Sequence, residues 1–320
     1  MTEIQNPVKT IAPIFPRLFA FIIDCLIVGV ACLVMGKVLY TYFENSPFIF
    51  QCLGTLLCLF YFSAFNSSIG DGKTIGKILC KIRVKDFTGA SISPTHALIR
   101  SSIFIIPFCF IGYLQSFAHP PLTLILIIAF FQSIVFACFY LAVFNGNSQQ
   151  SLHDVLTRTQ ILRNTQSNMP HQAIWKVHYY ILSLITMIIF SINVWHYVQN
   201  QNQNSTTHDL TSISDDIQNI QIENRYTFIG ETESTNQVLI LNVSQPAYLD
   251  QVDTAEKLIQ KLQQDSNILA QYKINQVQFN FSYQFGLAKL SKATIYDYKK
   301  TATTTQLTHI GDNTSVKLGF

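Results

Sequence analysis

The sequence predicts an α-helical polytopic membrane bundle of about five transmembrane helices, followed by a small soluble α+β domain at the C-terminus. Charged residues make up only 12% of the 320 residues and hydrophobic residues 49%, whereas about a quarter of a soluble protein is charged. Stretches of roughly twenty residues without a charge occur only before residue 200. Beyond that point the composition is that of an ordinary polar protein.

Five segments are apolar enough to cross a bilayer, whose core takes about 20 residues of helix. They run over residues 18–40, 47–65, 101–117, 122–144 and 177–198. The fifth has Trp and Tyr residues at both ends, as expected where a helix meets the two interfaces. Residues 1–16 are polar and contain prolines, so they do not resemble a cleavable signal peptide.

The basic residues predict the orientation of these spans. Loop 66–100 carries six Lys or Arg and loop 145–176 carries three, whereas the turns at 41–47 and 118–121 carry none. Basic loops stay in the cytoplasm, so we expect a multi-pass protein of the cell (inner) membrane with a cytoplasmic N-terminus. The expected organisation is a four-helix membrane domain over 1–165, a fifth helix over 177–198, a polar linker over 199–224 and a periplasmic domain over 225–320.

The first cytoplasmic loop contains structure of its own. Apolar residues at helical spacing and lysines four apart at Lys73, Lys77 and Lys81 predict a basic amphipathic helix on the inner leaflet. A solvated basic loop is the alternative. Residues 82–86 and 90–93 around Gly89 then predict a short hairpin.

Three segments carry a recognisable pattern. The first is Pro16-Arg17 followed by Asp24 in the first span. The second runs Asp71-Gly-Lys-Thr-Ile-Gly76-Lys77, then Arg83, Gly89 and Arg100. The third is Gln150-Ser-Leu-His153-Asp154 through Thr159. Together, over residues 13–163, they resemble the RDD family, membrane proteins named for one arginine and two aspartates.

The resemblance implies that Arg17, Asp24 and Asp154 are the residues of that name. It also implies transport of an ion or small ligand, with cation/proton exchange among the activities proposed for a largely uncharacterised family. This sequence departs from the pattern at Gln149 and Gln150, where a basic residue is expected before the His-Asp pair. The fifth span and the C-terminal domain lie outside the resemblance.

Asp24 is the most informative ionisable residue, because a carboxylate two turns inside a span costs several kcal/mol unless it is paired or hydrated. Arg17 lies seven residues earlier, about 10 Å along the helix, too far for direct pairing. Arg100 is the better partner in principle. Asp24 then either serves a proton or cation relay or fixes helix packing and moves nothing.

The sequence shows no support for an enzyme, a cofactor or a nucleic-acid partner. Gly72-Lys73-Thr74 lacks the upstream glycine of a phosphate loop, and His153-Asp154 has no second histidine cluster to form a metal site with it. We expect Asp154 to pair with a basic residue of the other cytoplasmic loop, closing both loops into one cap. The seven cysteines all lie in the membrane half and are expected to be packed thiols.

In the C-terminal domain, strands are expected at 238–243, 277–283 and 293–298, with a helix beginning near Asp253. This order, β-α-β-β, predicts a sheet packed on a helix. The alternating Phe279, Phe281 and Tyr283 are expected in its core. The domain is expected to recognise an envelope protein or a second copy of itself. Two functions stay open: a transporter or its accessory, and a non-catalytic scaffold that displays this domain.

Overall fold

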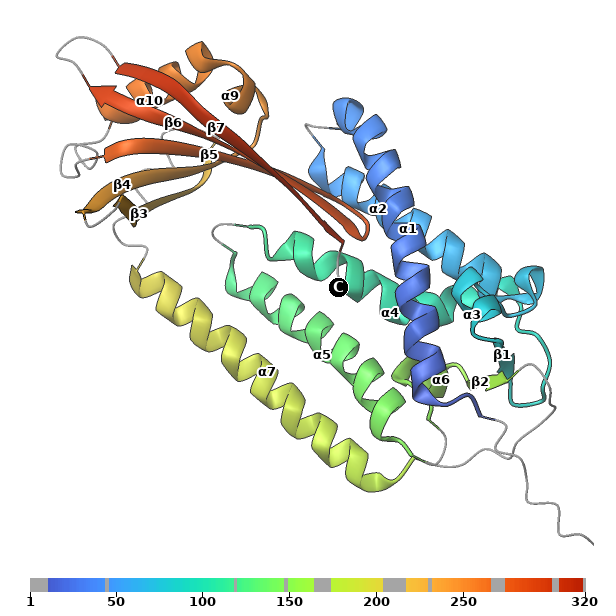
Figure 1. The fold of residues 1–320 in the computed structure, drawn as a ribbon. Helices are drawn as coiled ribbons and strands as arrows, with labels where there is room; N and C mark the ends of the chain where they lie inside the picture. Colours follow the sequence, from blue (N-terminus) through green and yellow to red (C-terminus); the bar gives the residue numbers. More distant parts are fainter. Residues whose placement is uncertain are drawn as a thin grey trace, which may run out of the picture.

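The computed structural model describes residues 11–43, 46–117, 120–146, 149–163, 174–203, 217–229, 232–265, 274–300 and 305–318. A helical bundle carries a β-sheet domain at one end and a small cap of short elements at the other (Figure 1). Five described helices are long and apolar enough to span a membrane. The predicted fold class is therefore confirmed.

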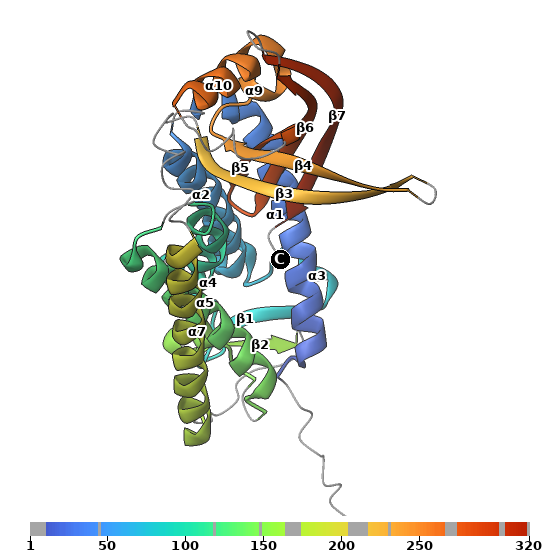
Figure 2. The same ribbon diagram turned by 90° about the vertical axis from the view of Figure 1, so that its left-hand side faces the viewer.

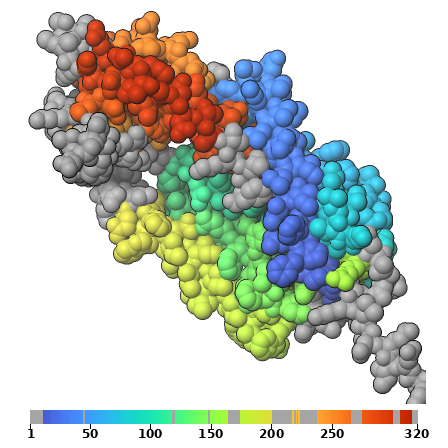
Figure 3. All heavy atoms as spheres, viewed as in Figure 1, coloured from blue at the N-terminus to red at the C-terminus, as the bar shows by residue number. Residues whose placement is uncertain are grey.

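The spans are α1 (Ile14–Phe43), α2 (Pro47–Asn66), α4 (Pro94–Leu114), α5 (Leu122–Phe144) and α7 (Lys176–Gln203). Helix α7 packs on α5 and forms the outer edge of the molecule (yellow in Figure 3). Helix α4 begins seven residues before the expected start, because the Ser93 side chain caps it by accepting from the N–H of His96, and Pro94 suits its first turn. Arg100 consequently lies inside this helix and not at its mouth.

The cap is formed by η1 (Ser68–Gly70), α3 (Ile75–Leu79), β1 (Ile82–Asp86), α6 (Leu152–Leu156) and β2 (Thr159–Arg163). Strand β1 pairs antiparallel with β2, so the hairpin expected within residues 82–93 is wrong. The turn at Gly89 does form, with φ +84° and an Asp86 N–H to Ala90 carbonyl bond of 3.0 Å. The partner strand, however, comes from the second loop.

The membrane half consists of two structural repeats 77 residues apart. Ile75–Leu79 and Leu152–Leu156 are equivalent helices, and Ile82–Asp86 and Thr159–Arg163 are equivalent strands. With the same offset in residue number, α1 is equivalent to α4 and α2 is equivalent to α5. It also relates the left-handed turn residues Lys81 (φ +55°) and Arg158 (φ +52°). We call the segments 14–86 and 94–163 repeat 1 and repeat 2.

The strand register shows how the repeats are related. Val84 pairs with Ile161, which is its own equivalent 77 residues later. An antiparallel pair has this register when a twofold axis passes between the two strands. Both repeats also begin at the cap end of the bundle, so the axis runs along the bundle, as in membrane proteins built from parallel repeats.

Helix packing departs from this twofold relation. Helix α2 packs along α4, whereas the equivalent pair, α5 and α1, is not packed along its length. The rings of Phe21 and Phe139 meet edge-on across this second seam, with centroids 6.0 Å apart. In Figure 2, β1 and β2 run across the view between α5 and the lower part of α1. We call the two contacts the α2–α4 seam and the α1–α5 seam.

The C-terminal domain is a five-stranded sheet in the order β3-β4-β5-β6-β7. Its strands are Ile217–Ile229, Thr232–Val243, Ile274–Phe285, Ala288–Lys300 and Thr305–Leu318. Helices α9 (Ala247–Asp250) and α10 (Val252–Asp265) connect the parallel pair β4 and β5. The core holds Leu258, Ile259 and Phe279, so the sheet packs on a helix as predicted.

Sequence patterning missed β3 and β7. Helix α7 continues to Gln203 and β3 begins at Ile217, so the expected linker 199–224 is too long and the domain begins earlier than residue 225. The Asn/Gln-rich run 199–203 continues a helix, while residues 204–216 lie outside the described part. Strand β3 is polar between its apolar positions, which is why its composition resembled a linker.

The long hairpin of β5 and β6 reaches into the bundle (Figure 1). At its tip, the N–H of Gly286 donates to Gln51 Oε1 at 3.1 Å, and Gln51 Nε2 donates to the carbonyl of Cys109 at 2.8 Å. Tyr283 stacks on Tyr40 of α1, with ring centroids 4.6 Å apart. Irregular backbone is tolerated at membrane depth when protein groups satisfy it, and the Gln51 amide does so here.

Candidate functional site

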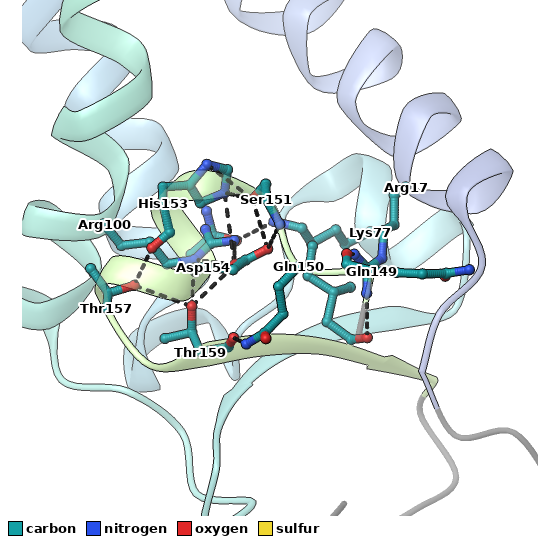
Figure 4. A network of polar contacts seen from close by, with 12 residues as sticks. Arg17, Lys77, Arg100, Gln149, Gln150, Ser151, His153, Asp154, Thr157 and Thr159 are labelled. Atoms are coloured by element: carbon teal, nitrogen blue, oxygen red, sulfur yellow. Dashed lines mark hydrogen bonds and ion pairs between the residues drawn. The ribbon is translucent and has the colours of Figure 1, made fainter. Parts of the chain in front are cut away.

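The strongest candidate site is a cavity of about 140 Å³ at the cap end of the bundle, between the two repeats. Its walls are mainly apolar side chains from α1, α4 and α5, including Phe21, Phe104 and Phe139. Its cap end is charged. The ionisable lining residues are Arg17, Asp24, Lys77, Arg100, His153 and Asp154. Figure 4 shows how five of these six gather with Gln149, Gln150 and Thr159.

Arg100 and Asp154 form the centre of this network. Arg100 Nη2 and Nε lie 2.6 and 3.1 Å from Asp154 Oδ1, and both side chains are at least 96% buried. Asp154 also accepts from the hydroxyls of Ser151 (2.8 Å) and Thr159 (3.1 Å). Burial opposes ionisation of Asp154, but the Arg100 guanidinium outweighs it and holds the pKa of this carboxyl well below its usual range. The predicted pairing of Asp154 with a basic residue of the other loop is confirmed.

Asp24 is held by neutral donors and not by Arg100, the partner expected from the sequence. Its carboxylate accepts from the hydroxyls of Tyr61 (2.7 Å) and Thr74 (2.5 Å) and from the N–H of Gly76 (2.8 Å). These bonds fix α3 against α1. A Cβ on Gly76 would lie 2.1 Å from the carbonyl oxygen of Ala20, so the close approach requires glycine.

Arg17 connects α1 to the second cap segment. Its guanidinium donates to the carbonyl oxygens of Gln149 and, at 3.1 Å, Ile161. It has no carboxylate within ion-pair distance among the described residues, and its Nε is buried without a partner. Arg17 and Asp24 do not pair directly, as their spacing predicted. At Gln149, where a basic side chain was expected, the backbone carbonyl makes the contact.

Lys77 is 92% buried, so it does not lie at the lipid surface as expected. Helix α3 is only five residues long, and its Ile78 and Leu79 are exposed while Lys77 turns inward and donates to Asn66 Oδ1. Burial, together with the neighbouring Arg100 guanidinium, lowers the pKa of Lys77 to about 7. Lys77 can therefore gain or lose a proton near neutral pH.

The cavity holds more positive than negative charge when Lys77 is protonated. Burial and Arg100 lower the pKa of His153 to about 3, so this ring is neutral at pH 7. The remaining lining charges are Arg17, Lys77 and Arg100 against Asp24 and Asp154, and each oxygen of the two carboxylates already accepts at least one hydrogen bond. A cation would compete with these donors for the carboxylate oxygens, whereas an anion would find the buried donors Arg17 Nε and Ser101 Oγ.

The other predicted loop residues lie outside the cavity. Lys73 pairs with Asp71 at 2.8 Å, and Arg83 lies 3.5 Å from the same carboxylate. The neighbouring ammonium groups of Lys73 and Lys85 lower the pKa of Asp71 to about 2. Lys81 is exposed. Gly89 shapes the turn after β1.

Sequence reasoning missed the role of Lys77 in the cavity and also Ser101, a buried lining residue whose hydroxyl has no partner among the described atoms. The 77-residue repeat in the sequence could have indicated both residues, because each is equivalent to an aspartate of the predicted pattern. Ser101 is the equivalent of Asp24, and Lys77 is the equivalent of Asp154. Among the described residues, no group of three His, Cys, Asp or Glu residues could hold a metal ion.

Comparison with known families agrees with this geometry. Residues 11–158 match the model of the RDD family, so this segment, which contains both repeats up to the start of β2, is an RDD-family membrane domain. The match ends before α7 and the sheet domain. No curated protein and no solved structure matches the chain.

Proposed function

We propose that the chain moves an ion or a small ligand across the membrane, or assists such transport, and that the cavity between the two repeats is its binding site. The observation that carries this proposal is the placement of a charged, partly apolar cavity on the interface of two twofold-related repeats. Transporters built from repeats bind their substrates at the repeat interface. Ionisable groups buried within a membrane domain commonly mark a substrate or proton path.

The charges favour an anionic or protonatable ligand over a bare cation, because both carboxylates are already engaged by donors of the protein. Lys77 supplies the protonation step that a proton-coupled carrier needs. In the orientation we propose from the basic loops, the cap faces the cytoplasm and the sheet domain faces the periplasm of the inner membrane. The hairpin tip then closes the periplasmic end of α1, α2 and α4.

Ion-jump currents test this proposal. Purified protein in proteoliposomes is exposed to steps of H⁺, Na⁺, K⁺, Cl⁻ and phosphate, and the transported charge is recorded on a solid-supported membrane. We expect a current in at least one step, and its loss in Lys77→Gln. Lys81→Gln removes the same charge from the same loop outside the cavity and is expected to keep the current. Equal currents in Lys77→Gln and wild type would contradict the proposal.

A scaffold role is the second candidate, and one observation favours it. Arg17, Asp24, Arg100 and Asp154 all bind cap or helix groups directly, and the hairpin tip fixes the sheet domain on the bundle. In this role the domain displays a surface to an envelope protein or a second copy of the chain. Affinity capture with the full chain then recovers a defined partner, and no ion step gives a current.

A further inference from the structure

The α1–α5 seam is where the cavity meets the membrane. Its lining residues Leu18 on α1 and Phe139 on α5 are 41% and 39% exposed, so the rim faces the hydrocarbon and not the protein. The equivalent α2–α4 seam is packed. A cavity with one lipid-facing side admits a ligand from the bilayer.

The cavity is amphipathic along its depth. Near the seam it is lined by Leu18, Phe104, Phe139 and Ala142, and at the cap end by the charged network. Arg17, Arg100 and the titratable Lys77 stand against two carboxylates, each oxygen of which already accepts at least one hydrogen bond. Arg17 Nε and Ser101 Oγ are buried polar atoms without a partner among the described residues. An anionic head with an apolar tail would match both ends.

We propose that this cavity binds an anionic phospholipid of the cap-side leaflet, with its phosphate at Arg17 and Lys77 and an acyl chain in the α1–α5 seam. The inference rests on the proposed function and names the chemistry of the ligand. Phosphate oxygens provide the acceptors that Arg and Lys require. The apolar walls would contact the acyl chain, whereas a free anion has no apolar group to pack against them.

The proposal also explains why the α1–α5 seam departs from the twofold relation. A tail lying between α1 and α5 keeps these helices apart, whereas α2 and α4 have no ligand between them and pack directly. Protonation of Lys77 strengthens the phosphate contact, so binding weakens as pH rises above 7. A ligand held by Arg17 alone would lack this pH step.

Short-chain lipids test the proposal on the purified full chain in detergent. Binding of dihexanoyl phosphatidylglycerol, dihexanoyl phosphatidylcholine and inorganic phosphate is measured by calorimetry. We expect phosphatidylglycerol to bind about tenfold more tightly than the other two. Equally tight binding of phosphatidylcholine would overturn the proposed preference for an anionic head group. Equal binding of inorganic phosphate would overturn the lipid part and assign the site to a free anion.

Variants assign the binding to the cavity. Lys77→Gln is expected to weaken phosphatidylglycerol binding about tenfold, and Lys81→Gln to leave it unchanged. Ala142→Phe fills the apolar wall and keeps every charge, so it is expected to weaken lipid binding even where Lys77→Gln folds poorly. Unchanged affinity in both cavity variants would overturn the proposal. Lipid binding without any ion current would leave this inference standing and contradict the transport proposal; a current without lipid binding would do the reverse.

Discussion

Repeat 1 and repeat 2 have the same elements in the same order, yet they place different charges at equivalent positions. Lys77 of repeat 1 corresponds to Asp154 of repeat 2, and Asp24 corresponds to Ser101. Arg100 has the apolar Ile23 as its equivalent. The shared pattern builds the frame, and the differences create the charged cavity on the axis. Shape and chemistry are therefore specified by different residues of the same repeats.

Arg100→Ile gives repeat 2 the residue found in repeat 1, and is expected to be the most damaging change. It leaves Asp154 buried without its cation, which costs about 3–5 kcal/mol. The midpoint of chemical unfolding in detergent measures this. The double variant Arg100→Ile/Asp154→Leu is expected to recover most of the loss. A single variant as stable as wild type would show that the pair does not hold the repeat.

Asp24→Asn tests the corresponding anchor in repeat 1. It removes the charge that three donors share and is expected to cost about 2–3 kcal/mol of stability. The matched change in repeat 2 is Ser101→Ala. The Ser101 hydroxyl has no partner in the described part of the chain, so the free energy of unfolding is expected to shift by no more than about 0.5 kcal/mol. Equal effects of the two variants would contradict the assigned roles.

Gln51→Ile tests the other end of the bundle, because Ile128 stands at the equivalent position on α5. The N–H of Gly286 loses its acceptor, at a cost of about 1–2 kcal/mol, and the hairpin tip is released more often. Limited proteolysis of the β5–β6 hairpin in the full chain is expected to speed up. An unchanged cleavage pattern would show that the Gln51 amide does not hold the tip.

The equivalent residues Lys77 and Asp154 predict pH dependences of stability that have the same sign but occupy different pH ranges. The pKa of Lys77 is lowered to about 7 from 10.5, so the unfolded chain binds its proton more tightly and stability rises between pH 7 and 10.5, by at most about 1.4 kcal/mol per pH unit. Lys77→Met should abolish this rise. The pKa of Asp154 is lowered, so its contribution is present above its usual range and is lost as the pH falls below about 4.

The sequence predicted the spans well, since hydrocarbon selects long uncharged helices whatever surrounds them. It also placed Asp154 against a basic residue of the other loop. It failed where long-range contacts decide. The partner of β1 lies 77 residues away, Lys77 turns inward because Asn66 and the cavity receive it, and Asp24 is satisfied by neutral donors from two other elements. Strands β3 and β7 were missed because their polar residues hide the alternation.

The most direct test concerns the difference between the two seams. Leu18→Cys/Ala142→Cys spans the α1–α5 seam, and the equivalent pair Phe65→Cys/Thr95→Cys spans the α2–α4 seam. The partly exposed Cys52 and Cys80 are replaced by Ser, while the other five cysteines are buried. Lipid binding and ion current are then measured before and after reaction with a short reducible thiol cross-linker.

We expect cross-linking of the α1–α5 seam to abolish both signals and reduction to restore them. Cross-linking of the α2–α4 seam should leave both unchanged. Full binding and full current with the α1–α5 seam closed would contradict the account.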